Sequence, residues 1–565
     1  MAERARRAAG NRRLMVVGVL LVLAWTMVGY RLTIVQGARA EEFAARGLDQ
    51  RLDRRSLPAD RGTIFDREGR ELAVTVDSIS VYANPREMSD PEAAAMELAR
   101  LLDVNAGDLM RDLASGAAFV YVARQLPPEE AAPIEEADIP GVYFLHEPKR
   151  VYPSGSLAAH VVGIVRSSDN VGLEGLELQY DRALAGTPGT LLVERDPAGL
   201  VIPQGEYQVV PAEQGSDLVT TIKVEIQYAA EQALARHLER TGATAGSVVV
   251  IDPTNGEILA MVNLPSYDPN GRDEVSSEAI RNRAVTDVFE PGSTQKAVTV
   301  SGALESGVVT PATPFDIPEK IEILDTTFED FTEHPDRLTV TEIVTYSSNL
   351  GTILLGDLLG IDRLHDVMDS FGQGSPTGID FPGEASGVLR PAEDWCLATC
   401  LAGTSIGYHV SVTPLQMAMV YATIANDGVW VQPHLVREVV GGTGERIVVV
   451  PEQRQVVSTR TARYMRTMLE AVVDSGTGSL ASVAGYRVGG KTGTTKKYLS
   501  ETQAYSEEDV VASFIGMAPI DAPRVVVAVV LDGPVEDASG GKGAAPIFAE
   551  IMLAALNQLG VPPDA

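Results

Sequence analysis

The chain is poor in the residues that build metal centres and disulfide frameworks. Its 565 residues include two cysteines, which cannot make a disulfide framework or a four-thiolate zinc site. The seven histidines are scattered, and no H-E-x-x-H motif occurs. We therefore predict that the protein uses no catalytic metal and no other cofactor.

Lysine is also scarce, and acidic residues outnumber basic ones. Eight Lys and 38 Arg stand against 77 Asp and Glu, which leaves a formal net charge of -31. A protein that binds nucleic acid needs clustered basic side chains to contact the phosphates. The composition therefore argues against a nucleic-acid partner, and it is otherwise ordinary for a globular protein, with 45% hydrophobic residues.

Only one uncharged apolar run approaches the length of a membrane span. It covers residues 14–30, and residues 32–35 can extend it if Arg31 snorkels toward the interface. We expect a single-pass anchor in the cell (inner or cytoplasmic) membrane. A cleaved signal peptide is the alternative, but no small-x-small cleavage site directly follows Tyr30. An excess of arginines before the run places the N-terminus in the cytoplasm and the rest of the chain outside: Arg4, Arg6, Arg7, Arg12 and Arg13.

The length predicts two or three domains. Residues 36–55 are polar and Ala-rich and indicate a stalk helix, and residues 58–69 read as strand, turn, strand. The predicted divisions are a cytoplasmic tail over 1–13, a membrane anchor over 14–35, a mixed α/β pedestal over 36–216 and a catalytic domain over 217–565.

The catalytic domain has strands near both of its ends and helices between them. Apolar hairpin patterns cover residues 247–262 and 510–531, and an amphipathic helix is predicted over 545–559. This order indicates an α+β fold in which an antiparallel sheet is flanked by helices.

Three short motifs occur in the order that is typical of serine acyl-transfer enzymes which need no histidine. A second S-x-x-K match, Ser539 to Lys542, has neither of the other motifs after it, so we treat it as a chance match. The three ordered motifs are Ser293-x-x-Lys296, Ser347-x-Asn349 and Lys491-Thr492-Gly493-Thr494.

The first two motifs supply a nucleophile, a base and a proton relay. Ser293 and Lys296 lie three residues apart, so on a helix they share one face. Lys296 can take the Ser293 proton only if it is neutral, and burial beside Lys491 would lower its pKa. Ser347 can pass a proton to the leaving amine, and Asn349 can hold a peptide-like substrate.

The third motif predicts an edge strand that an extended peptide can join. Lys491 and the hydroxyls of Thr492 and Thr494 suit a substrate carboxylate. Gly493 lies between these two threonines in the motif. The backbone N–H groups of Ser293 and Thr494 would form the oxyanion hole.

The two cysteines, Cys396 and Cys400, lie four residues apart on the side of the membrane that we expect to be oxidising. We expect them to pair, and a bridge fits a turn better than a regular helix. Two packed free thiols, or a zinc pair with His409, are the alternatives.

These residues resemble the penicillin-binding proteins of class B, from about residue 55 to the C-terminus. The pedestal residues that carry the likeness are Arg61 to Arg67, Arg150 to Pro153 and Gly172 to Glu177. In the catalytic domain they are Phe289 to Ser293, Ser405 to Tyr408, Thr413 to Met417 and Ile424 to Gly428.

The resemblance implies a penicillin-binding/serine beta-lactamase-like transpeptidase domain that cross-links peptidoglycan. Such an enzyme takes stem peptides ending in D-Ala-D-Ala, forms an acyl-enzyme on Ser293 and is acylated there by beta-lactams. The layout looks most like the FtsI-type septal enzymes, which implies a SEDS-type polymerase such as FtsW and other divisome proteins as partners. This chain departs from the usual pattern at His409 and over residues 396–404.

Three rival interpretations remain. A D,D-carboxypeptidase or beta-lactamase could share the fold, although the E-x-x-x-N segment of class A lactamases is absent. An α/β-hydrolase could use Ser405, because residues 403–407 match G-x-S-x-G, but that motif needs a preceding strand. A scaffold protein with vestigial chemistry is disfavoured, because every catalytic group is in place.

Overall fold

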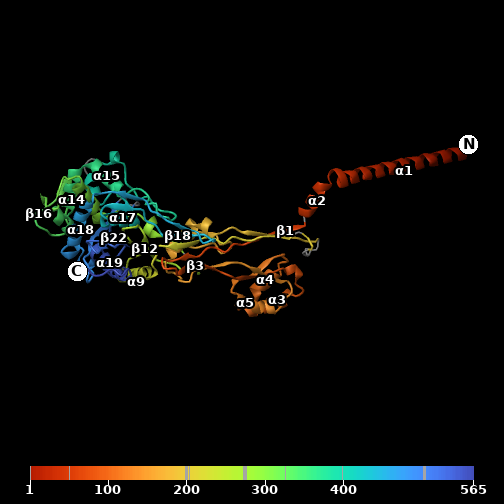
Figure 1. Ribbon diagram of the computed structural model, residues 1–565, viewed down its shortest axis with the longest axis horizontal. Helices are drawn as coiled ribbons and strands as arrows, with labels where there is room; N and C mark the ends of the chain where they lie inside the picture. The colour runs from red at the N-terminus through yellow and green to blue at the C-terminus, as the bar shows by residue number, and fades with distance from the viewer. Residues whose placement is uncertain are drawn as a thin grey trace. The chain divides into compact units, whose positions relative to one another are not determined.

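The computed structural model describes residues 2–565 except 50, 197–201, 203, 206, 272–275, 325, 397–398 and 500–503. The chain forms two compact units, one of residues 1–59 with 187–213 and the other of residues 60–186 with 214–565 (Figure 1). All three predicted motifs lie in the second unit.

The first unit contains the apolar N-terminal helix. Helix α1 (Ala2–Thr33) continues into a π-helical turn (Ile34–Ala38) and then α2 (Ala40–Asp49). Within the described residues, Asn11–Gly37 is the one stretch long and apolar enough to cross a membrane.

A small sheet completes this unit. Strand β1 (Leu52–Leu57) pairs antiparallel with β8 (Gly189–Glu194), which pairs with β9 (Tyr207–Val210). The predicted stalk helix is therefore wrong beyond residue 49. The backbone of residues 52–55 is hydrogen-bonded across to β8, a long-range partner that local sequence could not reveal.

The second unit begins with a six-stranded sheet. Its strand order is β19-β18-β10-β2-β3-β7. The turn predicted at residues 67–69 is present, and the second strand of that hairpin begins at Glu71. The strands are β19 (Arg446–Val448), β18 (Val436–Val440), β10 (Asp217–Thr220), β2 (Ile64–Phe65), β3 (Glu71–Val76) and β7 (Lys149–Val151).

A separate small core packs three strands against three helices in the pedestal region. Its buried side chains include Val81, Leu98 and Ile134. The elements are β4 (Ile79–Ala83), β5 (Val120–Leu126), β6 (Val142–His146), α3 (Pro91–Leu102), α4 (Ala106–Leu113) and α5 (Pro128–Glu136).

The catalytic region is built on a five-stranded antiparallel sheet, which confirms the predicted fold class. The strand order is β12-β11-β23-β22-β21, so β21 lies at an edge as predicted. The strands are β12 (Ile258–Leu264), β11 (Ala245–Ile251), β23 (Val525–Asp532), β22 (Ala504–Ala518) and β21 (Gly489–Leu499).

Both faces of this sheet are buried, which explains why its strands read as continuous apolar runs. Val248 and Val250 pack in one core with α9 (Val224–Thr241) and α19 (Ala545–Gln558). Val249 and Ile251 face the other core, which contains α17 (Pro414–Ala425). Figure 1 shows α19 and α17 on opposite sides of β22.

The middle of the catalytic region is helical, as predicted. These helices bring the first two motifs toward the edge strand β21. They are α12 (Lys296–Glu305), α13 (Val340–Tyr346), α14 (Asn349–Leu359), α15 (Ile361–Ser370), α16 (Thr399–Ser405) and α18 (Thr459–Asp474).

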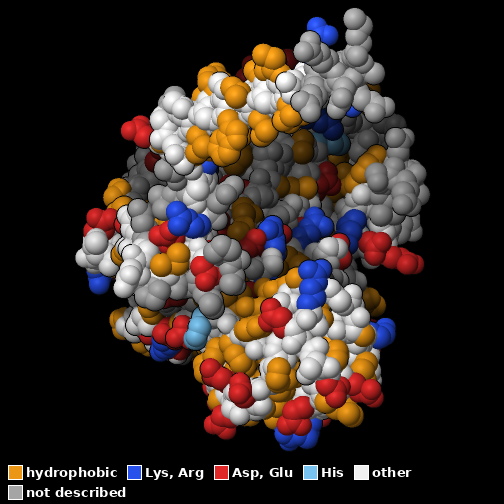
Figure 2. Space-filling view, turned by 90° about the vertical axis from the view of Figure 1, so that its right-hand side faces the viewer, with side chains coloured by type: hydrophobic (Ala, Val, Ile, Leu, Met, Phe, Trp, Pro, Cys, Tyr) orange, Lys and Arg blue, Asp and Glu red, His pale blue; other side chains and the backbone are white. Residues whose placement is uncertain are grey.

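Charged side chains of both signs are interspersed on the face shown in Figure 2. Red acidic and blue basic side chains both occur there, among orange hydrophobic ones.

Candidate active site

Ser293 is held by a contact between two glycine-bearing segments. Gly292 has φ +52, and its N–H donates to the Gly407 carbonyl over 3.1 Å. A Cβ on Gly407 would lie 2.2 Å from the Gly292 oxygen, so only glycine fits there. A 3-10 turn (Gly292–Gln295) then leads into α12, which begins at Lys296. The backbone that carries Ser293 therefore has little freedom to shift.

Lys296 is fully buried and contacts the second motif. Its Nζ donates to the backbone carbonyl of Ser347, to Asn349 Oδ1 over 2.8 Å and to Ser347 Oγ over 3.3 Å. Ser293 Oγ has no hydrogen-bond partner within the part of the chain that the structure describes. Ser293 therefore lies in the 3-10 turn that precedes Lys296, and Lys296 is hydrogen-bonded toward Ser347.

Ser347 lies between two helices and between two lysines. It ends α13 with φ +60, and Ser348 then caps α14 by accepting the Gly351 N–H. Lys491 Nζ donates to Ser347 Oγ over 2.8 Å, opposite Lys296. The structure therefore brings Lys296, Ser347, Asn349 and Lys491 together from three separate parts of the sequence.

Burial lowers the pKa of both lysines, and a neighbouring like charge adds to this effect at Lys296. Burial lowers the pKa of Lys296 well below its usual range, and the nearby Lys491 cation lowers it further, against an opposing effect of Asp330. Burial also lowers the pKa of Lys491 to about 7. A neutral Lys296 is the state that a base for Ser293 requires.

The K-T-G-T motif lies on the edge strand β21. Thr492 Oγ1 is 2.9 Å from Thr477 Oγ1, and Thr494 Oγ1 accepts the Gly540 N–H over 3.1 Å. A Cβ on Gly493 would lie 2.4 Å from Ser513 Oγ, which explains the glycine between the two threonines. The edge position of β21 leaves its outer side unpaired by any other strand among the described residues.

These residues meet at one cavity of about 680 Å³. Ser293, Ser347, Asn349, Thr492 and Thr494 all line it. The other lining residues come from five loop or turn segments and from β21 and β22: Gly292, Phe331, Thr332, Ile406, Tyr408, Thr477, Ser479, Leu480, Lys496, Val510, Ser539, Gly541 and Lys542.

Several residues of the site carry no sequence signal that we recognised. Asp330 accepts the Ser348 hydroxyl over 2.7 Å and the Leu350 N–H over 3.2 Å, so it fixes the start of α14. Phe331 is 94% exposed at the cavity mouth. Thr477 and Phe331 lie in loops with no motif, so only the fold places them here.

The two decoy serines have different surroundings. Ser405 is buried at the end of α16, and its Oγ donates to the Leu401 carbonyl over 2.7 Å. Within the described residues no strand leads into Ser405, which argues against a nucleophile elbow. The segment before Ser405 is helical from Thr399, while residues 397–398 lie outside the described residues. Ser539 does line the catalytic cavity, although it has no paired S-x-N motif of its own.

The cysteine pairing is confirmed, because Cys396 and Cys400 form a disulfide with a Cα–Cα separation of 5.1 Å. The bridge closes at the start of α16, and the Cys400 N–H also points at Cys396 Sγ over 2.9 Å. Helix α16 leads directly to Ile406 and Gly407, which border Ser293. Among the described residues, no group of three or more His, Cys, Asp or Glu side chains could hold a metal ion.

Fold and site together agree with a serine acyl-transfer enzyme, and comparison with known proteins makes the class specific. Residues 246–553 match the family "Penicillin binding protein transpeptidase domain", and residues 56–220 match "Penicillin-binding Protein dimerisation domain". The chain belongs to the penicillin-binding proteins, in the class B form that joins these two domains.

Relatives of similar length share both regions. The chain is 34% identical to "Probable peptidoglycan D,D-transpeptidase PbpC" of Pseudomonas aeruginosa, over 98% of this chain and 96% of that protein. It is 33% identical to "Peptidoglycan D,D-transpeptidase FtsI" of Escherichia coli, over 97% and 91%. A crystal structure of penicillin binding protein 3 from Mycobacterium tuberculosis, complexed with aztreonam, matches with a TM-score of 0.72 and 31% identity, over 90% of this chain and 98% of that one.

Proposed function

We propose that the protein is a peptidoglycan D,D-transpeptidase in which Ser293 attacks the stem-peptide carbonyl. The proposal rests on the hydrogen bonds that join Lys296 to Ser347 and Ser347 to Lys491. Ser293 lines the same cavity, and its Oγ has no hydrogen-bond partner among the described residues. Ser293 Oγ adds to the carbonyl carbon between the two terminal D-Ala residues, and Lys296 Nζ takes the proton. Ser347 passes that proton to the leaving D-Ala amine, and the acyl-enzyme remains on Ser293.

The second half-reaction reverses the proton path. An acceptor amine from a neighbouring stem adds to the acyl carbon, and its proton passes through Ser347 to Lys296 and back to Ser293 Oγ. A new amide forms as the ester breaks. The donor peptide lies along β21, with its carboxylate near Lys491, Thr492 and Thr494 and its oxyanion held by the Ser293 and Thr494 N–H groups.

A carboxypeptidase or beta-lactamase is the alternative on the same fold. Efficient hydrolysis of an acyl-enzyme needs a general base for water. The described residues that line the catalytic cavity include no Asp or Glu, which supports transfer to an amine over rapid hydrolysis. We expect the penicilloyl-enzyme to be long-lived, and a fast release of penicilloic acid would favour the lactamase alternative.

Location and partners are inferred from the first unit and from relatives. We infer that residues 14–35 form a single membrane anchor, with residues 1–13 cytoplasmic and the pedestal (36–216) and catalytic domain (217–565) outside. Helix α1 and the arginines before residue 14 support this orientation. The likeness to FtsI supports a septal role beside a SEDS-type polymerase such as FtsW and other divisome proteins.

Labelling with a fluorescent penicillin tests the central assignment. Ser293→Ala removes one oxygen, so the fold should survive and covalent labelling should disappear. Ser405→Ala is the matched control, because it removes a buried serine of the rival motif, and it should label normally. Undiminished labelling of Ser293→Ala would refute the assignment.

A further inference from the structure

Lysines concentrate at the catalytic cavity although the chain has few of them. Four of the eight contribute to this site, namely Lys296 and Lys491 beneath it and Lys496 and Lys542 on its wall. The other four have partners elsewhere: Lys223 pairs with Glu68, Lys320 with Glu322, Lys497 with Asp532, and Lys149 donates to the Gln125 carbonyl.

The two wall lysines are uncompensated. Within the part of the chain that the structure describes, neither Lys496 nor Lys542 forms a salt bridge, and both are exposed. Among the described residues, those that line this cavity include no carboxylate, although the chain has 77 Asp and Glu. Asp537, on the same loop as Lys542, is directed to Arg240 at 4.0 Å. The cavity is therefore a positive region in a strongly negative protein.

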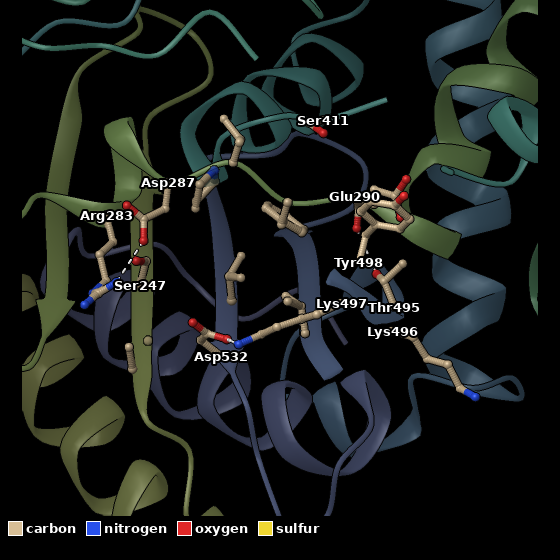
Figure 3. Close-up of a pocket in the computed structure, with 17 residues that line it drawn as sticks. Ser247, Arg283, Asp287, Glu290, Ser411, Thr495, Lys496, Lys497, Tyr498 and Asp532 are labelled. Carbon is tan, nitrogen blue, oxygen red and sulfur yellow. Dashed lines mark hydrogen bonds and ion pairs between the residues drawn. The ribbon is translucent and has the colours of Figure 1, made fainter. Parts of the chain in front are cut away.

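The positions of both lysines are set by backbone contacts. Thr492, Thr494 and Lys496 alternate along β21, so their side chains share the face toward the cavity. Lys496 also borders a second, smaller cavity, but Figure 3 shows its side chain directed outward from that cavity, in which Lys497 points to Asp532. The loop that carries Lys542 is seated on β21, because a Cβ on Gly540 would lie 2.5 Å from the Gly493 carbonyl.

We propose that Lys542, with Lys496, binds a second carboxylate of the acyl donor, upstream of its D-Ala-D-Ala end. This inference rests on the proposed function. In the proposed function, Lys491, Thr492 and Thr494 bind the terminal carboxylate. The wall lysines would therefore favour donors with a free upstream carboxylate over donors in which that carboxylate is amidated. The motif match Ser539 to Lys542, without catalytic partners of its own, would then contribute its lysine to recognition.

A pair of penicillins that differ by one side-chain carboxylate tests the proposal in the full chain. Carbenicillin carries this extra carboxylate and benzylpenicillin lacks it, so the ratio of their second-order acylation rates measures recognition of that group. Lys542→Gln should lower the carbenicillin-to-benzylpenicillin ratio about three- to fivefold, the size expected of an exposed ion pair. Adding Lys496→Gln should lower it further, and salt should weaken the effect in the unmodified protein.

Lys497→Gln is the matched control, because this lysine is on the same strand but faces the other cavity. An unchanged ratio in Lys542→Gln, or an equal drop in Lys497→Gln, would overturn the proposal. Failure of both penicillins to acylate the unmodified protein would instead overturn the proposed function. Donor peptides whose upstream carboxylates are amidated one at a time then identify which residue supplies the group, since only that amidation should remove the sensitivity to Lys542→Gln.

Discussion

Two clusters of buried charged residues in this protein differ in whether each charge has an opposite charge beside it. In the pedestal, Glu177 is fully buried between Arg61 and Arg150, at 2.6 Å and 2.7 Å. At the active site, Lys296 and Lys491 are buried with a serine hydroxyl between them and no carboxylate hydrogen-bonded to either among the described residues.

The difference separates a structural cluster from a chemical one. A buried charge that is matched by an opposite charge keeps its ionisation and fixes geometry. A buried cation without a direct counter-ion loses its proton more easily, and the pKa of both lysines is lowered. Mutations should therefore remove stability in the first cluster and activity in the second.

The largest expected effect is on activity, at Lys296. Lys296→Arg keeps a cation that cannot deprotonate. Acylation by benzylpenicillin should slow by roughly 10²–10⁴-fold, as for loss of a general base. Stopped-flow or gel-based acylation rates measure this, and a rate within about threefold of the unmodified protein would show that Lys296 is not the base.

The next effect is on stability, at Glu177. Glu177→Gln leaves the buried Arg150 guanidinium without its counter-ion, while Arg61 keeps its ion pair with Asp181, and should cost about 3–5 kcal/mol of unfolding free energy. The acylation rate of the folded fraction should be unchanged. Glu97→Gln, at an exposed pair with Arg100, is the control and should leave the denaturation midpoint where it is. Equal midpoints for all three proteins would contradict the distinction between the clusters.

A pH dependence follows from Lys491. Its pKa is about 7 when folded and 10.5 in its ordinary state, so between these values the unfolded chain binds a proton that the folded one lacks. Stability should therefore rise with pH across this window. Lys491→Met removes the group, and denaturation at pH 7 and pH 9 should show a smaller rise for the variant than for the unmodified protein. Parallel rises would mean that Lys491 keeps its proton when buried.

The smallest effect is expected at the disulfide. Cys396→Ser/Cys400→Ser opens a loop of about five residues, which contributes only about 2 kcal/mol on chain-entropy reckoning. Because α16 leads to Gly407 beside Ser293, acylation rates should change more visibly than the melting temperature. A large drop in melting temperature with an unchanged acylation rate would show that the disulfide stabilises the whole fold rather than the active-site backbone.

Local sequence patterns were sufficient to predict much of the fold. The apolar strands of the five-stranded sheet, the terminal helix and the edge position of Lys491 to Thr494 follow from periodicity and motif order. The contacts among Lys296, Ser347 and Lys491 agree with what those motifs predicted, although the catalytic roles of these residues stay predictions.

Long-range partners account for what the sequence did not reveal. The sequence of residues 52–55 predicts a helix, but in the structure these residues pair with strand β8. Asp330 belongs to no motif, so the sequence does not link it to Ser348. Lys542 was visible only as part of a chance match, because its place on the cavity wall depends on how its loop sits over Gly493. Local sequence does not encode such contacts.

The six-stranded sheet joins the pedestal and the catalytic region into one hydrogen-bonded body. Leu218 of β10 donates to the Thr63 carbonyl over 2.9 Å, and a Cβ on Gly62 would lie 2.0 Å from the Ser216 carbonyl. A protease that cut the chain at 216/217 would therefore not release two independent pieces. A fragment beginning at residue 217 would carry β10 with a bare edge where β2 belongs, and we expect it to aggregate rather than work alone.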